Sequence, residues 1–226
     1  GEVASGLAAT RLAADLGRLI VSSSLQDHPA GHDAATIERH ILNEVGAANF
    51  AIFHAAQSTP GYAGMGTTLV LAWLYDNRMS VAHVGDSRLY RLRGDDFDLL
   101  THDHSLIQEL LDNGQISPEE ARHAEGRNLV TRALGVAPTV EVDIQEFDVQ
   151  PGDVILLCSD GLNDMLDDEE IALALRTLSG NLQLAADHLV DMANDHGGRD
   201  NVSVILIKAM ADFAAPRGWW RRLQQL

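Results

Sequence analysis

Three aspartates stand where apolar segments of the sequence end or begin. Asp160 closely follows the run VILLC, Asp86 closely follows VAHV, and Asp200 directly precedes NVSVILI. Aspartate is a favoured turn residue, so each position taken singly fits an ordinary turn. Three apolar strands that all end or begin in acid, beside glycine or serine, favour a shared chemical purpose.

The chemistry that such carboxylates favour is metal binding, because clustered carboxylates repel one another unless a cation lies between them. Oxygen ligands with no Cys or His in the same motifs favour Mg²⁺ or Mn²⁺ over Zn²⁺. Two such ions about 3.5–4 Å apart can activate a water for attack on phosphorus. Composition and spacing alone therefore indicate a hard-metal site and leave the reaction open.

The hydrophobic pattern predicts the elements that must position these aspartates. Apolar residues at helical spacing predict helices over residues 2–20 and 35–57. Short turns at Asp76-Asn77 and at Gly94 join alternating segments into antiparallel strands. Residues 104–136 are polar and helical and interrupt the strands.

The second half of the chain continues this mixture of strands and helices. Strands are predicted over 140–147 and 153–159, helices over about 168–178 and 181–195, and a last strand in NVSVILIK. Helices at both ends of a run of antiparallel strands predict an α+β protein of layered sheets covered by helices.

Composition excludes several classes of protein. The chain carries 16 Lys and Arg against 33 Asp and Glu, a net charge of −17, which argues against nucleic-acid binding and favours divalent cations or basic polypeptides. A single cysteine, Cys158, excludes an internal disulfide and fits a reducing compartment. No apolar run approaches the roughly 20 residues that span a bilayer. We therefore expect a cytoplasmic protein.

Six motifs occur in the order seen in the metal-dependent protein phosphatases, the type 2C serine/threonine family. They are GMGTTL (64–69), HVGDSRLY (83–90), THDHS (101–105), RNLVTRALG (127–135), CSDGLNDM (158–165) and GGRDNVSVILI (197–207). Over residues 1–208 the chain resembles the compact bacterial branch of this family. The resemblance implies an αββα four-layer sandwich of two antiparallel sheets flanked by helices. It also implies two Mn²⁺ or Mg²⁺ ions and hydrolysis of phosphoserine and phosphothreonine in proteins, with a metal-bound water rather than a side chain as the nucleophile.

The resemblance assigns a role to each aspartate. Asp160 resembles a ligand of the first metal that also reaches a third, looser ion, with Gly161 beside it as a supporting residue. Asp200 resembles the other ligand of the first metal, and Asn201 holds its turn. Asp86 is similar to the carboxylate that helps bind the third ion.

The resemblance also divides the chain into a phosphatase domain (residues 1–208) and a C-terminal tail (209–226). Residues 104–136 resemble the flap beside the active site, where family members differ in substrate choice. Arg132 in the flap has two interpretations, a contact with the substrate or a salt bridge within the flap.

The chain departs from the family pattern at its start. Family members begin with two strands that supply a phosphate-binding Arg, a histidine proposed as general acid, and an Asp that bridges both metals. Here GEVASGLAATRLA resembles the helix that follows those strands. We therefore expect these 226 residues by themselves to bind metal weakly and hydrolyse little. Gly1 in place of Met favours a lost N-terminal piece over a natural inactive form.

Two functions from different classes follow. The first is a phosphatase that acts as a monomer on phosphorylated proteins, the substrates of a cognate serine/threonine kinase. The alternative is a non-catalytic regulator with the same fold that binds a phosphoprotein or a kinase. The presence of all three aspartates argues against the regulator, because a site that no longer binds a cation does not require like charges held together.

Four other features favour ordinary structural roles. Gly61 to Thr68 has the spacing of a P-loop, but Thr67 replaces the lysine. His83, His102 and His104 lack the spacing of a zinc site. Cys158 ends an apolar strand and is expected to be inert. Trp219 to Arg222 in the tail is expected to lie on the protein's own surface rather than on a membrane.

Overall fold

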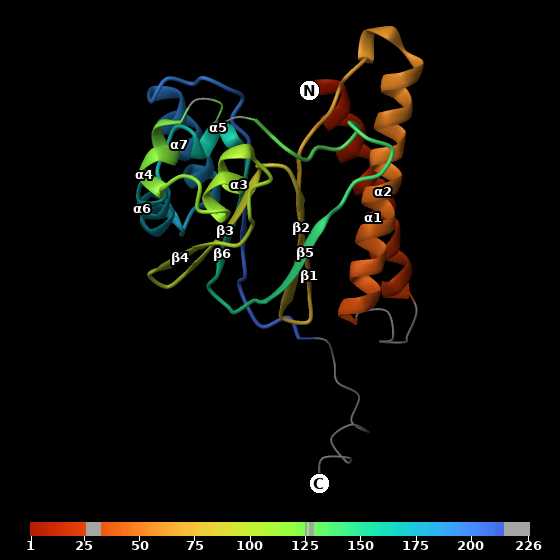
Figure 1. Cartoon of the computed structure of the whole chain (residues 1–226). Helices are drawn as coiled ribbons and strands as arrows, with labels where there is room; N and C mark the ends of the chain where they lie inside the picture. Colours follow the sequence, from red (N-terminus) through yellow and green to blue (C-terminus); the bar gives the residue numbers. More distant parts are fainter. Residues whose placement is uncertain (26–32, 125, 127–128, 215–226) are drawn as a thin grey trace.

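The computed structural model describes residues 1–25, 33–124, 126 and 129–214. Two long helices, α1 (Glu2–Leu25) and α2 (Ala34–Ser58), lie side by side along one side of the molecule (Figure 1). Asp33 caps α2 by accepting a hydrogen bond from the Thr36 amide at 2.7 Å. A short turn of 3₁₀ helix, η2 (Pro60–Tyr62), follows α2. The predicted tail segment from Trp219 to Arg222 lies outside the described residues.

Within the described residues, seven strands form two antiparallel sheets, with the strand orders β1-β2-β5 and β4-β3-β6-β7. Their bounds are β1 (Leu69–Tyr75), β2 (Arg78–Val84), β3 (Arg88–Arg93), β4 (Asp96–Leu99), β5 (Asp143–Asp148), β6 (Val154–Cys158) and β7 (Val204–Lys208). Helices α5 (Asp160–Asn163), α6 (Asp168–Leu178) and α7 (Leu182–Asp195) lie with the second sheet, on the side away from α1 and α2 (Figure 1). The predicted four-layer arrangement of helices, two sheets and helices is confirmed.

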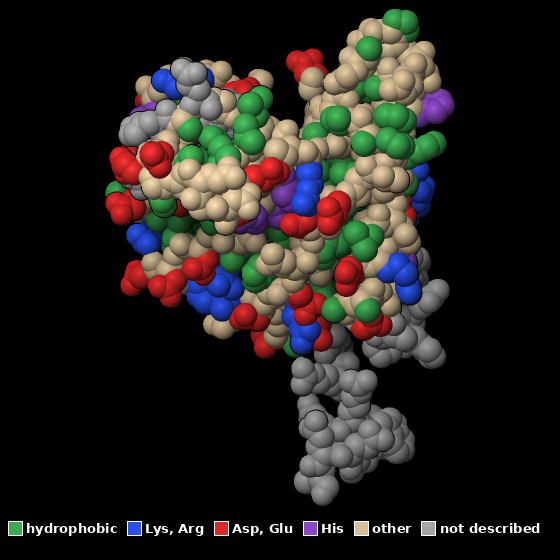
Figure 2. All heavy atoms as spheres, in the orientation of Figure 1, with side chains coloured by type: hydrophobic (Ala, Val, Ile, Leu, Met, Phe, Trp, Pro, Cys, Tyr) green, Lys and Arg blue, Asp and Glu red, His purple; other side chains and the backbone are tan. Residues whose placement is uncertain are grey.

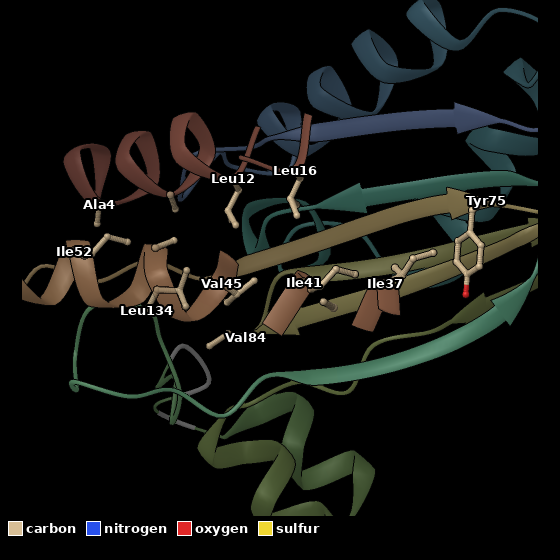
Figure 3. Packing of buried hydrophobic residues seen from close by; sticks show 13 residues of the cluster. Ala4, Leu12, Leu16, Ile37, Ile41, Val45, Ile52, Tyr75, Val84 and Leu134 are labelled. Carbon is tan, nitrogen blue, oxygen red and sulfur yellow. The ribbon is translucent and has the colours of Figure 1, made fainter. Parts of the chain in front are cut away.

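Alternation along the strands produces three apolar layers. In β6, Ile155 and Leu157 face the space between the sheets, whereas Val154, Leu156 and Cys158 face α6 and α7. A strand buried on both faces is continuously apolar, which explains the run VILLC. The third layer lies between α1, α2 and the first sheet (Figure 3). Its labelled members are Ala4, Leu12, Leu16, Ile37, Ile41, Val45, Ile52, Tyr75, Val84 and Leu134.

The predicted hairpins form, but the strands do not stay in one sheet. Asp76 and Asn77 have φ values of 41° and 58°, as the tight turn between β1 and β2 requires. Gly94, with φ of 59°, occupies the turn between β3 and β4. Between β2 and β3 the chain passes from the first sheet to the second. Asp86 lies in that crossover.

The predicted helical interruption, residues 104–136, is called the flap below, and its described residues contain two short helices, α3 (Leu106–Asp112) and α4 (Pro118–His123). Ser117 and Glu120 form a reciprocal capping box that starts α4, as the sequence predicts. The two ends of the flap meet, because Ser105 bridges Val130 and the Leu106 amide donates to the Leu129 carbonyl at 2.9 Å. The flap therefore leaves and returns to the sandwich at one place.

Two predicted strands begin late, and each has a physical reason. β5 begins at Asp143 rather than at residue 140, because its partner β2 places His83 opposite Asp143 and ends one residue later. β7 begins at Val204, because Ser203 instead bonds to the turn at Ser159. The Ser203 amide donates to the Ser159 hydroxyl at 3.0 Å.

Residues 209–214 lie against the sandwich. The Ala209 amide donates to the Asp153 carbonyl at 2.9 Å, and the Phe213 amide donates to Asn77 Oδ1 at 2.7 Å. In the part of the chain that the structure describes, no helix combines the length and apolarity needed to cross a bilayer.

Candidate metal centre

Asp160 is positioned by the end of β6 and the start of α5. The chain turns directly from the buried strand into the helix, and Asp160 is the first helical residue. One carboxylate oxygen, Oδ1, accepts a hydrogen bond from the Gly161 amide at 2.9 Å. The carboxyl group is half-buried, and this burial, together with the charges of Asp200 and Asp164, raises its pKa.

The turns that carry Asp160 and Asp200 are packed tightly against each other. A Cβ atom on Gly161 would lie 2.4 Å from the Asn201 carbonyl oxygen, so the contact needs glycine. The Ser159 hydroxyl donates to the same carbonyl at 3.0 Å. Asp200 itself is exposed, and its Oδ1 accepts from the Asn201 amide at 2.7 Å. These contacts hold the two carboxylates close enough for the charge of Asp200 to act on Asp160.

Asp86 is the most buried of the three predicted ligands, at 7% exposure. Burial raises the pKa of Asp86 to about 6, and the charges of Asp160, Asp103 and Asp164 act in the same direction. A buried carboxylate surrounded by other carboxylates is destabilised in its charged form unless a cation is close. A divalent cation would supply the missing charge.

Asp86 and Asp160 line the same cleft, of about 300 Å³. One wall comes from the sandwich and α5, and it carries Asp86, Arg88, Asp103, Asp160 and Asp164. The other wall comes from the flap and includes Ile107, Leu111 and Pro118. The cleft is therefore lined by acidic side chains and by apolar side chains from the flap. Acidic side chains are also spread over the wider face shown in Figure 2.

The donor set fits a hard divalent cation. All the candidate ligands at this cleft are carboxylates, which Mg²⁺ and Mn²⁺ prefer. Asp200 does not line the cleft, and among the described residues the three aspartates do not form a group whose ligand atoms all lie within 4.8 Å. The charge of Asp200 acts on Asp160 from the neighbouring turn.

The chain matches known proteins along most of its length. Serine/threonine phosphatase stp of Listeria innocua is 39% identical over 212 residues, covering 91% of this chain and 82% of the relative. The crystal structure of the Mycobacterium tuberculosis serine/threonine phosphatase PstP/Ppp is 34% identical with a TM-score of 0.77, covering 93% of this chain and 84% of that one. This chain belongs to the type 2C family of bacterial serine/threonine phosphatases.

Two further matches support the assignment. A catalytic domain of the serine/threonine phosphatase PstP, solved in complex with two manganese ions, is 36% identical with a TM-score of 0.76, covering 91% of this chain and 80% of that one. The family profile of Stage II sporulation protein E (SpoIIE) matches residues 110–209.

Sequence reasoning about this phosphatase missed three charged residues of the cleft. Asp164 lies one helical turn after Asp160 in CSDGLNDM, and that spacing was the available signal. Arg88 donates to Asp103 from Nε at 3.0 Å and from Nη2 at 2.7 Å. Arg88 and Asp103 come from separate segments, so their pairing neutralises one carboxylate in a way that only the fold reveals.

Arg132 links the flap to the first sheet. Its Nη1 donates to Asp143 Oδ1 at 2.9 Å, and its Nη2 lies 3.6 Å from Glu141 Oε2. Both partners lie outside residues 104–136, so this is a salt bridge that leaves the flap rather than one within it. Burial alone would raise the pKa of Asp143, but the hydrogen bonds from His104 and Arg132 and the charge of Arg132 outweigh it and lower the pKa.

Cys158 should be chemically inert in the folded protein. It is 3% exposed, and burial raises the pKa of its thiol to about 12. Because the thiolate is the reactive species, we expect a disulfide reagent at mildly alkaline pH to react at least about a hundredfold more slowly with folded protein than with denatured protein. Absorbance of the released thiol measures this, and equal rates would contradict the buried environment.

Proposed function

We propose that this phosphatase removes phosphate from phosphoserine and phosphothreonine side chains of proteins by hydrolysis. The observation that carries the proposal is the meeting of Asp86 and Asp160 in one acidic cleft, within a chain that belongs to the type 2C family. A bound pair of metal ions would supply an activated water and positive charge against the phosphoryl oxygens.

Each residue contributes to that chemistry through its position. Asp160 and Asp200 hold the first cation from two turns that are fixed to each other through Gly161 and Asn201. Asp86 offers a buried carboxylate for a third, weaker cation. A bound cation would stabilise the charged form of the Asp86 and Asp160 carboxylates, whose pKa values are raised in its absence.

Substrate choice belongs to the flap wall of the cleft. Ile107, Leu111 and Pro118 contribute apolar surface to the cleft that Asp86 and Asp160 also line. We propose that a phosphoprotein segment lies between these walls, and that its phosphorylation comes from a cognate serine/threonine kinase in the cytoplasm. Because hard oxygen ligands accept both ions, Mn²⁺ and Mg²⁺ both fit, and Mn²⁺ is the first ion to test.

Hydrolysis of a phosphothreonine peptide tests the proposal. The protein is expressed from the start of its own reading frame, stripped of metal with a chelator, and assayed by phosphate release during titration with Mn²⁺. We expect no turnover without metal and saturable turnover with it. Binding of Mn²⁺ and of phosphopeptide with no phosphate release would refute the enzyme and favour the non-catalytic regulator.

A further inference from the structure

His104 is a junction between three parts of the molecule. Its backbone amide donates to the Gly85 carbonyl at 3.0 Å, and its side-chain Nδ1 accepts from the Gly85 amide at 3.1 Å. Its backbone carbonyl accepts from the Thr131 amide, at the far end of the flap, at 2.8 Å. Its Nε2 lies 3.3 Å from Asp143 Oδ2 on β5. One residue therefore joins the crossover turn, both ends of the flap and the first sheet.

Gly85 needs this support. Its φ of +105° is a conformation that other residues rarely adopt, and a Cβ atom there would lie 2.4 Å from Thr68 Cγ2. His104 satisfies both main-chain hydrogen-bonding groups of Gly85, and the next residue is Asp86. The direction in which the Asp86 carboxylate points therefore depends on the turn that His104 holds.

The surrounding cluster resembles a metal site by distance but not by hydrogen bonding. Ligand atoms of His83, His104 and Asp143 all lie within 4.8 Å of one another. However, His104 Nδ1 accepts a hydrogen bond from the Gly85 amide, so the neutral ring carries its proton on Nε2, which lies 3.3 Å from Asp143 Oδ2 and 3.4 Å from Arg132 Nη1. The guanidinium of Arg132 already provides the cation, because it donates to Asp143 at 2.9 Å. The cluster is therefore an internal ion-pair network.

Stacking and burial hold His104 in this orientation. Its ring stacks on that of His83 with a centroid separation of 4.7 Å, and both residues are at most 5% exposed. His83 Nε2 is fixed in turn by the His102 carbonyl at 2.7 Å. The imidazole cannot rotate without breaking contacts on three sides.

We propose that His104 is a positioning residue that fixes the Gly85–Asp86 turn and couples the seating of the flap to the cation affinity of Asp86. Movement of the flap end at Thr131 or Arg132 would act on His104, through its carbonyl or through Asp143, and from there on Gly85. The inference rests on the proposed function only in taking Asp86 as a cation ligand.

Two substitutions at His104 separate its contacts. In His104→Asn the side-chain oxygen takes the place of Nδ1 and keeps the acceptor for Gly85, but the reach to Asp143 is lost. In His104→Leu both contacts are lost. Because second-shell partners of a metal typically change affinity by about 10- to 100-fold, we expect His104→Leu to weaken the weakest Mn²⁺ site at least about tenfold. His104→Asn, which keeps the acceptor for Gly85 and loses only the contact with Asp143, should weaken that site by a smaller factor than His104→Leu.

Isothermal titration calorimetry with Mn²⁺ measures this directly and requires no turnover. Asp112→Asn is the matched control, because Asp112 accepts from His102 at 2.7 Å on the exposed surface of the same flap. The control should leave the titration unchanged. Identical isotherms for wild type and a folded His104→Leu would overturn the inference, as would equal losses in Leu and Asn variants.

Two further arms keep the test decisive. If His104→Leu does not fold, Asp143→Asn replaces it, since it removes the charge that orients His104 and Arg132; an unchanged weak site in that variant overturns the coupling to the flap. Mn²⁺ binding by a wild-type protein that releases no phosphate refutes the proposed function alone. Absence of any Mn²⁺ binding to the wild type overturns both.

Discussion

Asp160→Asn should reduce Mn²⁺-dependent hydrolysis of a phosphothreonine peptide at least about a hundredfold, because a neutral amide replaces a carboxylate that would hold the cation. The substitution keeps the local fold, since the amide oxygen can still accept from the Gly161 amide. It also removes one of several clustered negative charges, whose mutual repulsion adds to burial in raising the pKa values of Asp86 and Asp160. In the metal-free protein we therefore expect a melting temperature equal to or above that of wild type.

The combination of lost activity and retained stability distinguishes a ligand from a structural residue. The measurement pairs kcat/KM at saturating Mn²⁺ with thermal unfolding in the presence of a chelator. Asp187→Asn, the same chemical change at an exposed position on α7, should leave both quantities unchanged. Activity of the Asp160 variant within a few-fold of wild type would contradict the assignment.

Local features of this fold could be predicted because each depends on a few neighbouring residues. The turn at Asp76-Asn77 and the start of α4 at Ser117-Pro118 are fixed by backbone preferences within four residues. The continuous apolar run of β6 likewise reports a strand buried on both faces. The layered class follows, because helices and sheets with one apolar face must cover each other.

Non-local pairings could not be predicted from pattern alone. β2 and β3 are consecutive strands, yet they belong to different sheets, and their separation is what places Asp86 in a crossover. Arg132 was read as a contact within the flap or with the substrate, whereas its partner Asp143 lies on β5. The local sequence around a carboxylate does not show whether that carboxylate pairs with a distant arginine or is exposed to solvent.

The same reasoning applies to the candidate site. Asp86, Asp160 and Asp200 were identified as candidates because the glycine and serine turns at strand ends can be recognised in the sequence. Asp103 and Asp164 were not, because their approach to Asp86 depends on how the flap and α5 fold over the cleft. The electrostatics of the site is therefore a property of the assembled sandwich.

Arg93→Met should lower the free energy of unfolding by about 3–5 kcal/mol, the cost of leaving one partner of a buried ion pair unpaired. Arg93 donates to Asp153 Oδ1 at 2.8 Å and to Oδ2 at 2.7 Å, and Asp153 is 1% exposed. The Gln150 amide still donates to Asp153, but it carries no full charge.

Denaturant unfolding measures the change, and Arg78→Met is the control. Arg78 pairs with Glu146 at the surface, where a lost pair costs about 1 kcal/mol or less. Adding Asp153→Asn to the Arg93 variant should recover part of the loss, because the uncompensated charge disappears. A loss below about 1 kcal/mol in the single variant would show that water reaches Asp153.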